Sequence, residues 1–266
     1  MVLDMQRREF KIVSLPQLLR GYRIPLDLTE VGRRILRLSN DERIARRLNC
    51  LEQHAGLDRV AAEHSRDMAL RGYFDHRDPE GKDPLDRVEA GCRQLIVQRA
   101  GENIACLTVD GDAAWVASEL VQGWMESPGH RANILDAGWT HLGVGLWRRG
   151  NCVWATQVFV GLLAELDGAP PGRVRHGAEV RIRFRVYPRW HRPGEVEAIV
   201  QVPDRQLLID HGSGYYGAGW YPAPCHWKGS TLCVHFVPRH GPGQYEIGLA
   251  RRGIHQFVPA FRVMVV

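Results

Sequence analysis

The sequence is poor in two features that would each assign it to a well-defined class, long apolar runs and cysteine. In its 266 residues, no uninterrupted apolar run approaches the roughly 20 residues that a membrane-spanning helix needs. The first stretch, Met1 to Arg20, carries charges every few positions and lacks the apolar core of a secretory signal. Six cysteines are too sparse for a disulfide scaffold. We therefore expect no transmembrane segment, and either a protein that stays inside the cell or one whose signal has been removed.

Signatures of several function classes are also missing. No Gly-x-Ser-x-Gly elbow is present to serve a serine hydrolase. The acidic stretch Asp75 to Asp83 lacks the alternating Asp and Asn ligands of a calcium loop, so we interpret it as a solvated loop. No helix-turn-helix, zinc finger or ribonucleoprotein motif accompanies the basic charge, and we expect no nucleic-acid partner.

The composition is that of a globular protein with unevenly distributed charge. Hydrophobic residues make up 44% of the chain and charged residues 24%, enough apolar material for a buried core. From Gly168 onward, 13 Lys and Arg stand against 6 Asp and Glu, a net charge of +7. The whole chain carries +5, so the part before Gly168 carries −2. An anionic partner would therefore favour the C-terminal part.

A Gly/Pro cluster at Leu166 to Gly172 predicts a domain boundary, because mixed helix and strand patterns precede it and only strand patterns follow. We expect an N-terminal extension over residues 1–38, a mixed domain over 39–166 and an all-β domain over 173–266. The length of the chain agrees with two compact units.

Local signals in the mixed domain predict helices followed by paired strands. Two predicted helices are followed by a glycine, and the second of these starts at an Asp-Pro pair. A capping aspartate precedes a longer amphipathic run, which a Ser-Pro pair ends. A turn then separates two apolar runs. These signals predict helices over Leu57 to Met68 ending at Gly72, Asp83 to Gly91, Asp112 to Trp124 and Pro128 to Leu135, and strands over His141 to Trp147 and Val153 to Val160.

The region after the boundary alternates in the manner of half-buried strands. Ile182, Phe184 and Val186 share one predicted face, and three arginines share the other. Strands are predicted at Val180 to Val186, Val196 to Val202, Leu207 to Asp210, Leu232 to Val237, Tyr245 to Ala250 and Val258 to Val265. Their spacing favours an immunoglobulin-like sandwich, although no Cys…Trp…Cys pattern supports a true immunoglobulin domain.

Six short motifs follow one another in the N-terminal part. They are His64-Ser-Arg-Asp-Met68, Tyr73-Phe-Asp-His76, Gly101-Glu-Asn-Ile-Ala105, Trp124-Met-Glu-Ser-Pro-Gly-His-Arg131 with Asn133-Ile-Leu135, Gly143-Val-Gly145 and Thr156-Gln-Val-Phe159. In this order and spacing they resemble the bacterial branch of the CAP superfamily, which comprises cysteine-rich secretory proteins, antigen 5 and pathogenesis-related proteins of class 1. The resemblance implies an α+β fold: a CAP-type α-β-α sandwich, here followed by the all-β, immunoglobulin-like domain.

The resemblance also implies a cleft lined by two histidines and two glutamates. By position the histidines are His76 and His130, and the first glutamate is Glu102. The family position of the second glutamate holds Ser127, and the neighbouring Glu126 is the remaining candidate. One residue on a helix is a rotation of about 100°, so Glu126 need not face the cleft.

Two imidazoles and a carboxylate leave three functions open. With His76 and His130 as ligands and Glu102 beside them, they can hold a divalent metal such as zinc and leave a coordination position open for hydrolysis. In such a hydrolase, Glu102 and His130 would be the catalytic residues. The same trio can bind a ligand without any cofactor, Glu102 fixing the tautomer of an imidazole. A purely structural or interaction role is the third hypothesis.

Resemblance to the family implies binding rather than enzymatic activity. The expected ligand is a small apolar or amphipathic molecule or a cell-envelope component, and the expected location is secreted or the cell envelope. The absence of a visible signal leaves a cytoplasmic location open.

Three further residue groups have simpler interpretations. We expect His64 to be a hydrogen-bonded core histidine, because it lies on the apolar stripe of its helix, and Ser127 to be a helix cap. The pairs Cys92 with Cys106 and Cys225 with Cys233 are either disulfides or free thiols.

Overall fold

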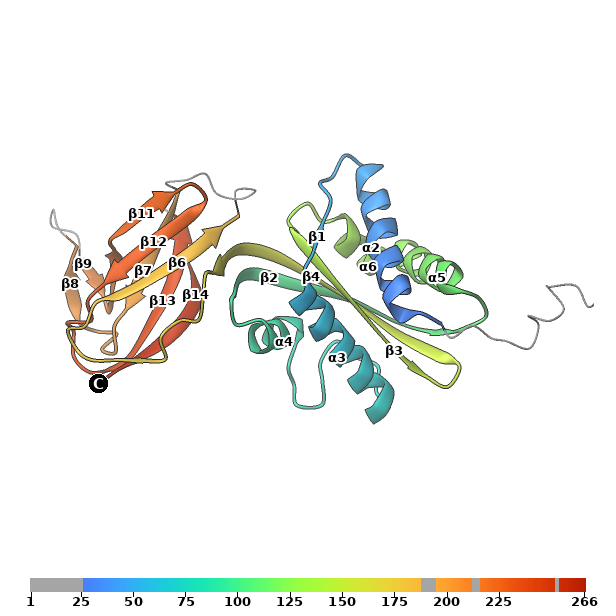
Figure 1. The fold of residues 1–266 in the computed structure, drawn as a ribbon, viewed down its shortest axis with the longest axis horizontal. Coiled ribbons are helices and arrows are strands. Elements are labelled where there is room, and N and C mark those ends of the chain that lie inside the picture. Colours follow the sequence, from blue (N-terminus) through green and yellow to red (C-terminus); the bar gives the residue numbers. More distant parts are fainter. Residues whose placement is uncertain (1–25, 188–194, 212–215, 252–253) are drawn as a thin grey trace, which may run out of the picture.

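The computed structural model describes residues 26–187, 195–211, 216–251 and 254–266. The described chain forms two lobes, a mixed helix and sheet lobe followed by a lobe of strands, with one long strand running between them (Figure 1). The mixed content confirms the α+β class.

Helices cover both faces of the sheet in the first lobe (Figure 1). Their bounds are α2 Leu28–Ile44, α3 Ala55–Arg71, α4 Pro84–Gly91, α5 Ala113–Glu126 and α6 Pro128–Leu135. Capping residues in the sequence decide where these helices start. Asp83 and Asp86 form a capping box at α4, and Asp112 accepts a hydrogen bond from the backbone N–H of Trp115 at the start of α5.

Glycine stands at the end of both helices for which the sequence predicts a terminal glycine. Gly72 follows α3 with a φ of 74°, the left-handed conformation that glycine adopts without steric cost. Gly91 is the last residue of α4, where the predicted helix also ends, and Cys92 is the capping residue. A Cβ at Gly91 would lie 2.7 Å from Cγ2 of Val60, so this glycine allows α4 to pack closely on α3.

Helix α2 spans the expected boundary after residue 38. Val31 and Ile35 are fully buried in the same core as α5 and α6. The guanidinium of Arg43 donates to the carbonyls of Ile134 and Asp136 at 2.7 and 2.8 Å. The described residues before position 39 therefore pack as part of the mixed lobe.

The sheet of this lobe is built on a central strand. The strands are β1 Glu52–Gln53, β2 Leu95–Thr108, β3 His141–Arg149 and β4 Cys152–Leu166. Strand β4 pairs antiparallel with both β2 and β3, and among the described strands β2 has no other neighbour. Successive side chains of β4 enter different cores: Phe159 lies under α2, α5 and α6, whereas Val158 and Val160 lie under α3 and α4. The edge strand β2 positions the candidate site.

The second lobe consists of two packed sheets. The described strands are β5 Arg173–Val174, β6 Val180–Val186, β7 Val196–Gln201, β8 Leu208–Asp210, β9 Tyr216–Ala218, β10 Trp220–Ala223, β11 Cys225–Lys228, β12 Thr231–Phe236, β13 Gly243–Arg251 and β14 Ile254–Val265. One sheet has the order β6-β12-β11 and the other β10-β7-β13-β14-β5, while β8 and β9 form a separate two-stranded sheet. Apolar side chains of both sheets form a single core.

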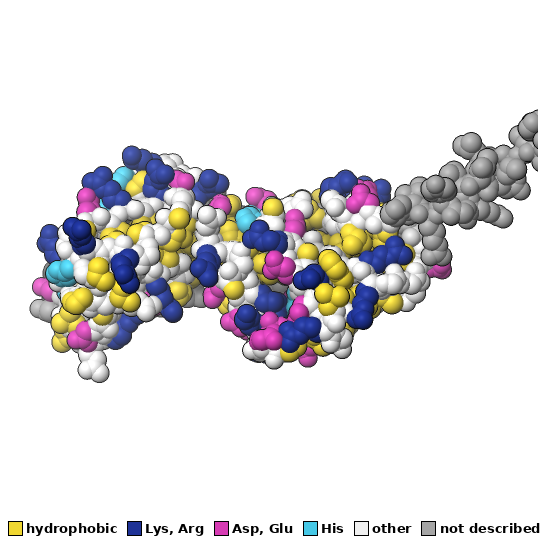
Figure 2. All heavy atoms as spheres, turned by 60° about the horizontal axis from the view of Figure 1, so that its bottom comes forward, with side chains coloured by type: hydrophobic (Ala, Val, Ile, Leu, Met, Phe, Trp, Pro, Cys, Tyr) yellow, Lys and Arg dark blue, Asp and Glu magenta, His cyan; other side chains and the backbone are white. Residues whose placement is uncertain are grey.

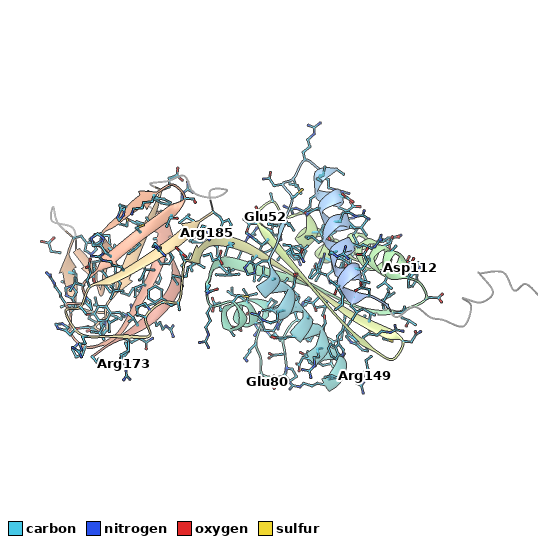
Figure 3. The ribbon with its side chains drawn as sticks, viewed as in Figure 1. Glu52, Glu80, Asp112, Arg149, Arg173 and Arg185 are labelled. Atoms are coloured by element: carbon cyan, nitrogen blue, oxygen red, sulfur yellow. The ribbon has the colours of Figure 1, made fainter. Side chains whose placement is uncertain are left out.

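Strand β4 continues from the first lobe into the second. Its last residues pair with β6, Ala164 opposite Val186 and Leu166 opposite Phe184. Leu163, Ala164 and Leu166 are buried in the core of the second lobe. Figure 3 labels Arg185 at this junction, where its side chain lies 3.6 Å from the Glu165 carboxylate. The two lobes therefore share one hydrogen-bonded sheet.

Cys92, Cys106, Cys225 and Cys233 lie in the described part of the chain, where none of them forms a disulfide. The structure thus agrees with the thiol alternative for the pairs Cys92 with Cys106 and Cys225 with Cys233. Among the described residues, no helix is both long and apolar enough to cross a membrane.

Candidate functional site

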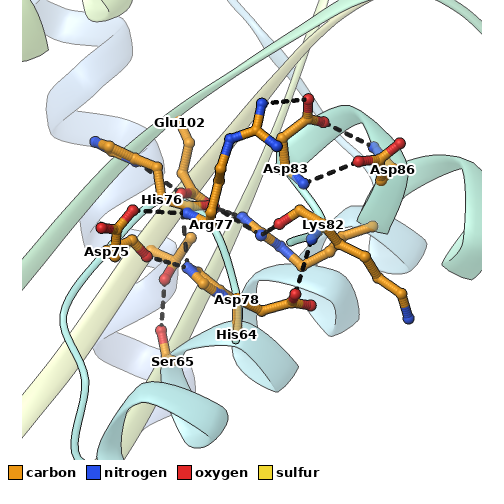
Figure 4. A network of polar contacts seen from close by, with 12 residues as sticks. His64, Ser65, Asp75, His76, Arg77, Asp78, Lys82, Asp83, Asp86 and Glu102 are labelled. Carbon is orange, nitrogen blue, oxygen red and sulfur yellow. Dashed lines mark hydrogen bonds and ion pairs between the residues drawn. The ribbon is translucent and has the colours of Figure 1, made fainter. Parts of the chain in front are cut away.

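Glu102 is the centre of the candidate site. Strand β2 carries it, and its side chain is only 1% exposed. Its Oε1 accepts a hydrogen bond from Nδ1 of His76 at 2.8 Å, and its Oε2 accepts one from Arg87 at 2.6 Å (Figure 4). Both carboxylate oxygens are therefore engaged with protein groups.

Arg87 binds the loop between α3 and α4 to Glu102. While Nη2 contacts the carboxylate, Nη1 donates to the carbonyls of His76 and Lys82 at 2.9 and 2.8 Å. The side chain is 10% exposed. One buried guanidinium therefore neutralises the glutamate and fixes the backbone that presents His76.

The loop that follows Gly72 is held by its own polar side chains. Asp78 accepts a hydrogen bond from the backbone N–H of Lys82, and Glu80 receives two hydrogen bonds of 2.8 Å from Arg71. Figure 4 shows Asp78 bonded to Lys82 within the loop. The stretch from Asp75 to Asp83 is thus an exposed loop, as expected, and hydrogen bonds give it a defined structure.

His76 is the part of this network that reaches solvent. Its side chain is 48% exposed, although one ring nitrogen is bonded to Glu102. The hydrogen bond to Glu102 raises the pKa of His76, and partial burial opposes that effect. Its other ring nitrogen is the atom with which it can meet a ligand.

His64 lies beneath the network, as expected for a core histidine. Its side chain is fully buried, its Nε2 lies 3.1 Å from the carbonyl of Asp75 and 3.7 Å from Glu102. Burial lowers the pKa of His64, so the neutral ring is favoured. Tyr73, at 3.4 Å from its other nitrogen, donates to Asp67 at 2.7 Å.

His130 lies near enough to His76 to be affected by its charge, and it comes from the opposite helical layer. It lies in α6 and is half-buried. Burial lowers the pKa of His130, and the nearby charge of His76 lowers it further. Because β2 is an edge strand, residues from both faces of the sheet can meet around it.

Two buried amide side chains and one partly buried one link α6 to the sheet at β2. The Nδ2 group of Asn103 donates to the carbonyl of His130 at 3.1 Å and to Gln157 at 3.0 Å. Asn133 donates to the carbonyl of Glu102 and to Asn103, each at 2.9 Å. Sequence reasoning assigned no role to these amides or to Arg87. The amides lie inside the quoted motifs, which was the available signal.

Glu126 lies apart from the other three candidates. It is exposed on α5, where its carboxylate accepts a hydrogen bond from Gln122 at 2.8 Å, and it lines a groove against α2. The family position is the next residue, Ser127, and one residue on a helix is a rotation of about 100°. Glu126 therefore points away from the other candidates, and its assignment to the cleft was wrong. Ser127 stands between α5 and α6 at the cap position, but its side chain makes no capping hydrogen bond.

The arrangement does not fit a three-ligand metal site. Arg87 and His76 occupy the two oxygens of Glu102, and the guanidinium places a positive charge where a cation would bind. Among the residues that the structure describes, no group of three or more His, Cys, Asp or Glu side chains is placed to hold a metal ion.

His76 and His130 are expected to have different pKa values. In an imidazole NMR titration, the pKa of His76 should lie above its ordinary value of 6.5 and that of His130 below it. In Glu102→Gln, the pKa of His76 should fall, because the charged hydrogen-bond acceptor is lost. A His76 that titrates below His130 in the parent protein would contradict this assignment.

The fold and site define an α+β domain whose sheet lies between helical layers and carries a buried Glu–Arg–His network at its edge strand. Residues 36–159 match the CAP family, the cysteine-rich secretory protein family. The region of the chain that carries the six motifs is thus similar to the CAP family, as the motifs predict.

Two curated relatives come from Bacillus subtilis strain 168. YkwD is 34% identical over 137 residues, which cover 52% of this chain and 49% of YkwD. The membrane protein YlbC is 40% identical over 132 residues, which cover 50% of this chain and 35% of YlbC. The matched region therefore spans half or less of each relative. A crystal structure of an extracellular SCP-domain protein from Bacillus anthracis is 34% identical, with a TM-score of 0.43, over 50% of this chain and 40% of that one.

Proposed function

We propose that the chain is a non-enzymatic binding protein whose site at His76, Glu102 and His130 takes a small apolar or amphipathic ligand, such as a component of the cell envelope. The observation that carries the proposal is a half-exposed imidazole in a short segment of chain that also exposes apolar side chains. Phe74, two residues before His76, is 55% exposed, and Leu70 in the last turn of α3 is 48% exposed. Such a segment suits a ligand with an apolar body and a polar or anionic end.

The engagement of Glu102 supports binding over hydrolysis. A general base must reach water or substrate, whereas the Glu102 side chain is only 1% exposed and both of its oxygens are bonded to protein groups. Ser65, the serine in the first motif, is buried and bonded to the carbonyl of Gly145 and to Thr156. The binding role requires no metal.

The proposed location is secreted or the cell envelope. The name of YlbC as a membrane protein and the description of the Bacillus anthracis protein as extracellular support this placement. We also infer that the second lobe is an immunoglobulin-like sandwich that serves attachment. Its two sheets enclosing one core support that inference.

The proposal predicts a specific loss of ligand affinity. A dansyl-labelled long-chain fatty acid, titrated against Phe74→Ala, should bind roughly 5–30-fold more weakly than to the parent protein, the equivalent of about 1–2 kcal/mol of lost apolar contact. His76→Gln should also weaken binding and remove its pH dependence. In the parent protein, affinity should fall as pH rises through the raised pKa of His76, because the imidazolium loses its charge.

Leu208 provides the matched control. It is 70% exposed in the second lobe, so Leu208→Ala removes a comparable apolar side chain away from the site. Its affinity should equal that of the parent protein, with and without EDTA. Equal losses in Leu208→Ala and Phe74→Ala, or no loss in either site variant, would reject the proposal.

A further inference from the structure

The outer face of the β6-β12-β11 sheet gathers cationic side chains. Burial alternates along β6, which leaves Arg181, Arg183 and Arg185 exposed on one face. The strand register extends this face, which also carries His235, Thr231 and Cys233 from β12 and His226 and Lys228 from β11. Three arginines, one lysine and two histidines thus share one surface, here called the basic face.

Part of the basic face is hollowed. A cavity of about 660 Å³ lies over it, and the turn from Asp167 to Pro171 lines it as well. Lining side chains include Arg181, Arg183, His226, Lys228 and His235. Figure 2 shows Lys and Arg side chains recurring over the lobe of strands, with fewer acidic ones. The excess agrees with the net charge of +7 from Gly168 onward.

Carboxylates pair with the arginines without using up their donors. Arg181 lies 2.9 Å from Glu179, and Arg183 lies 2.9 Å from Asp167. The two arginine side chains are 79% and 62% exposed, and exposed ion pairs contribute little free energy. A guanidinium has five N–H donors, so each retains donors for an anion.

We propose that the basic face binds a linear polymer that carries repeated phosphate groups. Arginines two residues apart on a strand recur about every 6.8 Å, which suits a chain of regularly spaced anions. The guanidinium fork matches phosphate oxygens, and a hollow admits a polymer chain where a flat bilayer would meet only its rim. This site is independent of the ligand site at His76.

Binding of inorganic polyphosphate, followed by calorimetry at low salt, tests the proposal. The parent protein should bind, and Arg181→Gln/Arg183→Gln should bind at least tenfold more weakly. The slope of log affinity against log salt should fall by about one for each arginine removed. Arg183→Lys should bind more tightly than the double variant, because lysine keeps the positive charge. It should bind more weakly than the parent protein, because lysine lacks the paired N–H donors of the guanidinium.

Arg262 provides the matched control on the other sheet. It is 67% exposed and 2.9 Å from Glu246, much as Arg183 is 62% exposed and 2.9 Å from Asp167. Arg262→Gln should bind polyphosphate like the parent protein. Equal loss in this control, or no binding by the parent protein, would overturn the proposal.

Anionic vesicles separate a polymer site from a membrane contact. Vesicles of phosphatidylglycerol and phosphatidylcholine that bind more tightly than polyphosphate, with the same dependence on Arg181 and Arg183, would also overturn it. Titration of the dansyl fatty acid into the double arginine variant should be unchanged, so that failure at one site is distinguishable from failure at the other.

Discussion

Arg87→Met is expected to lower the free energy of unfolding by about 3–5 kcal/mol, the usual cost of removing one partner from a buried ion pair. The variant leaves Glu102 inside the protein without its guanidinium, and it releases the carbonyls of His76 and Lys82. Chemical denaturation followed by circular dichroism measures the loss.

The loss in Arg87→Met should be larger at pH 8 than at pH 5.5. The pKa of His76 in the folded protein is raised above its ordinary value of 6.5. The stabilisation from His76 is therefore fully present below about pH 6.5 and disappears as pH rises through the folded-state pKa. At low pH the imidazolium remains to pair with Glu102, and at high pH it does not.

Two further variants test whether the ion pair is the cause. Arg77→Met removes an arginine of the same loop that is 65% exposed, and it should cost less than about 1 kcal/mol. Arg87→Met/Glu102→Gln should lose less stability than the two single variants together, because the stranded charge is gone. An additive double variant would show that Arg87 acts through packing alone.

Gly145→Ala is expected to destabilise the protein by about 3 kcal/mol or more, the upper range for overpacking. A Cβ at Gly145 would lie 1.9 Å from the backbone nitrogen of Ala62 in α3. Backbone cannot rotate out of the way as a side chain can, so α3 would have to leave β3. Thermal and chemical denaturation measure the change.

Gly123→Ala is the matched control for this steric argument. A Cβ at Gly123, in α5, meets no atom of the described residues within 4 Å. This variant should gain about 0.5–1 kcal/mol, because alanine is the better helix former. Similar losses in both variants would mean that close approach of α3 is not the reason for glycine at position 145.

The elements that sequence analysis predicts are those with local signals. Gly72, Asp83 and Asp112 each bound a helix through contacts a few residues away. Strand β2 gave no such signal, since Arg99, Gly101 and Glu102 interrupt its apolar pattern. Its extended form depends on pairing along β4, a long-range interaction.

In the candidate site, too, the residues that lie in short sequence motifs were predictable, and those that depend on long-range contacts were not. The motifs led to His76 and Glu102, which the structure places in direct contact. Arg87 was missed because its role arises only when the loop before α4 folds back onto β2. Glu126 was placed wrongly because sequence neighbours on a helix point in different directions.

The strand β4 that runs through both lobes has a consequence for how the molecule is oriented. A flexible tether would let each lobe tumble by itself, whereas Leu163 and Leu166 fix the second lobe to the strand that also supports the first. A molecule immobilised through the basic face would therefore hold the His76 side of its first lobe in one constant orientation.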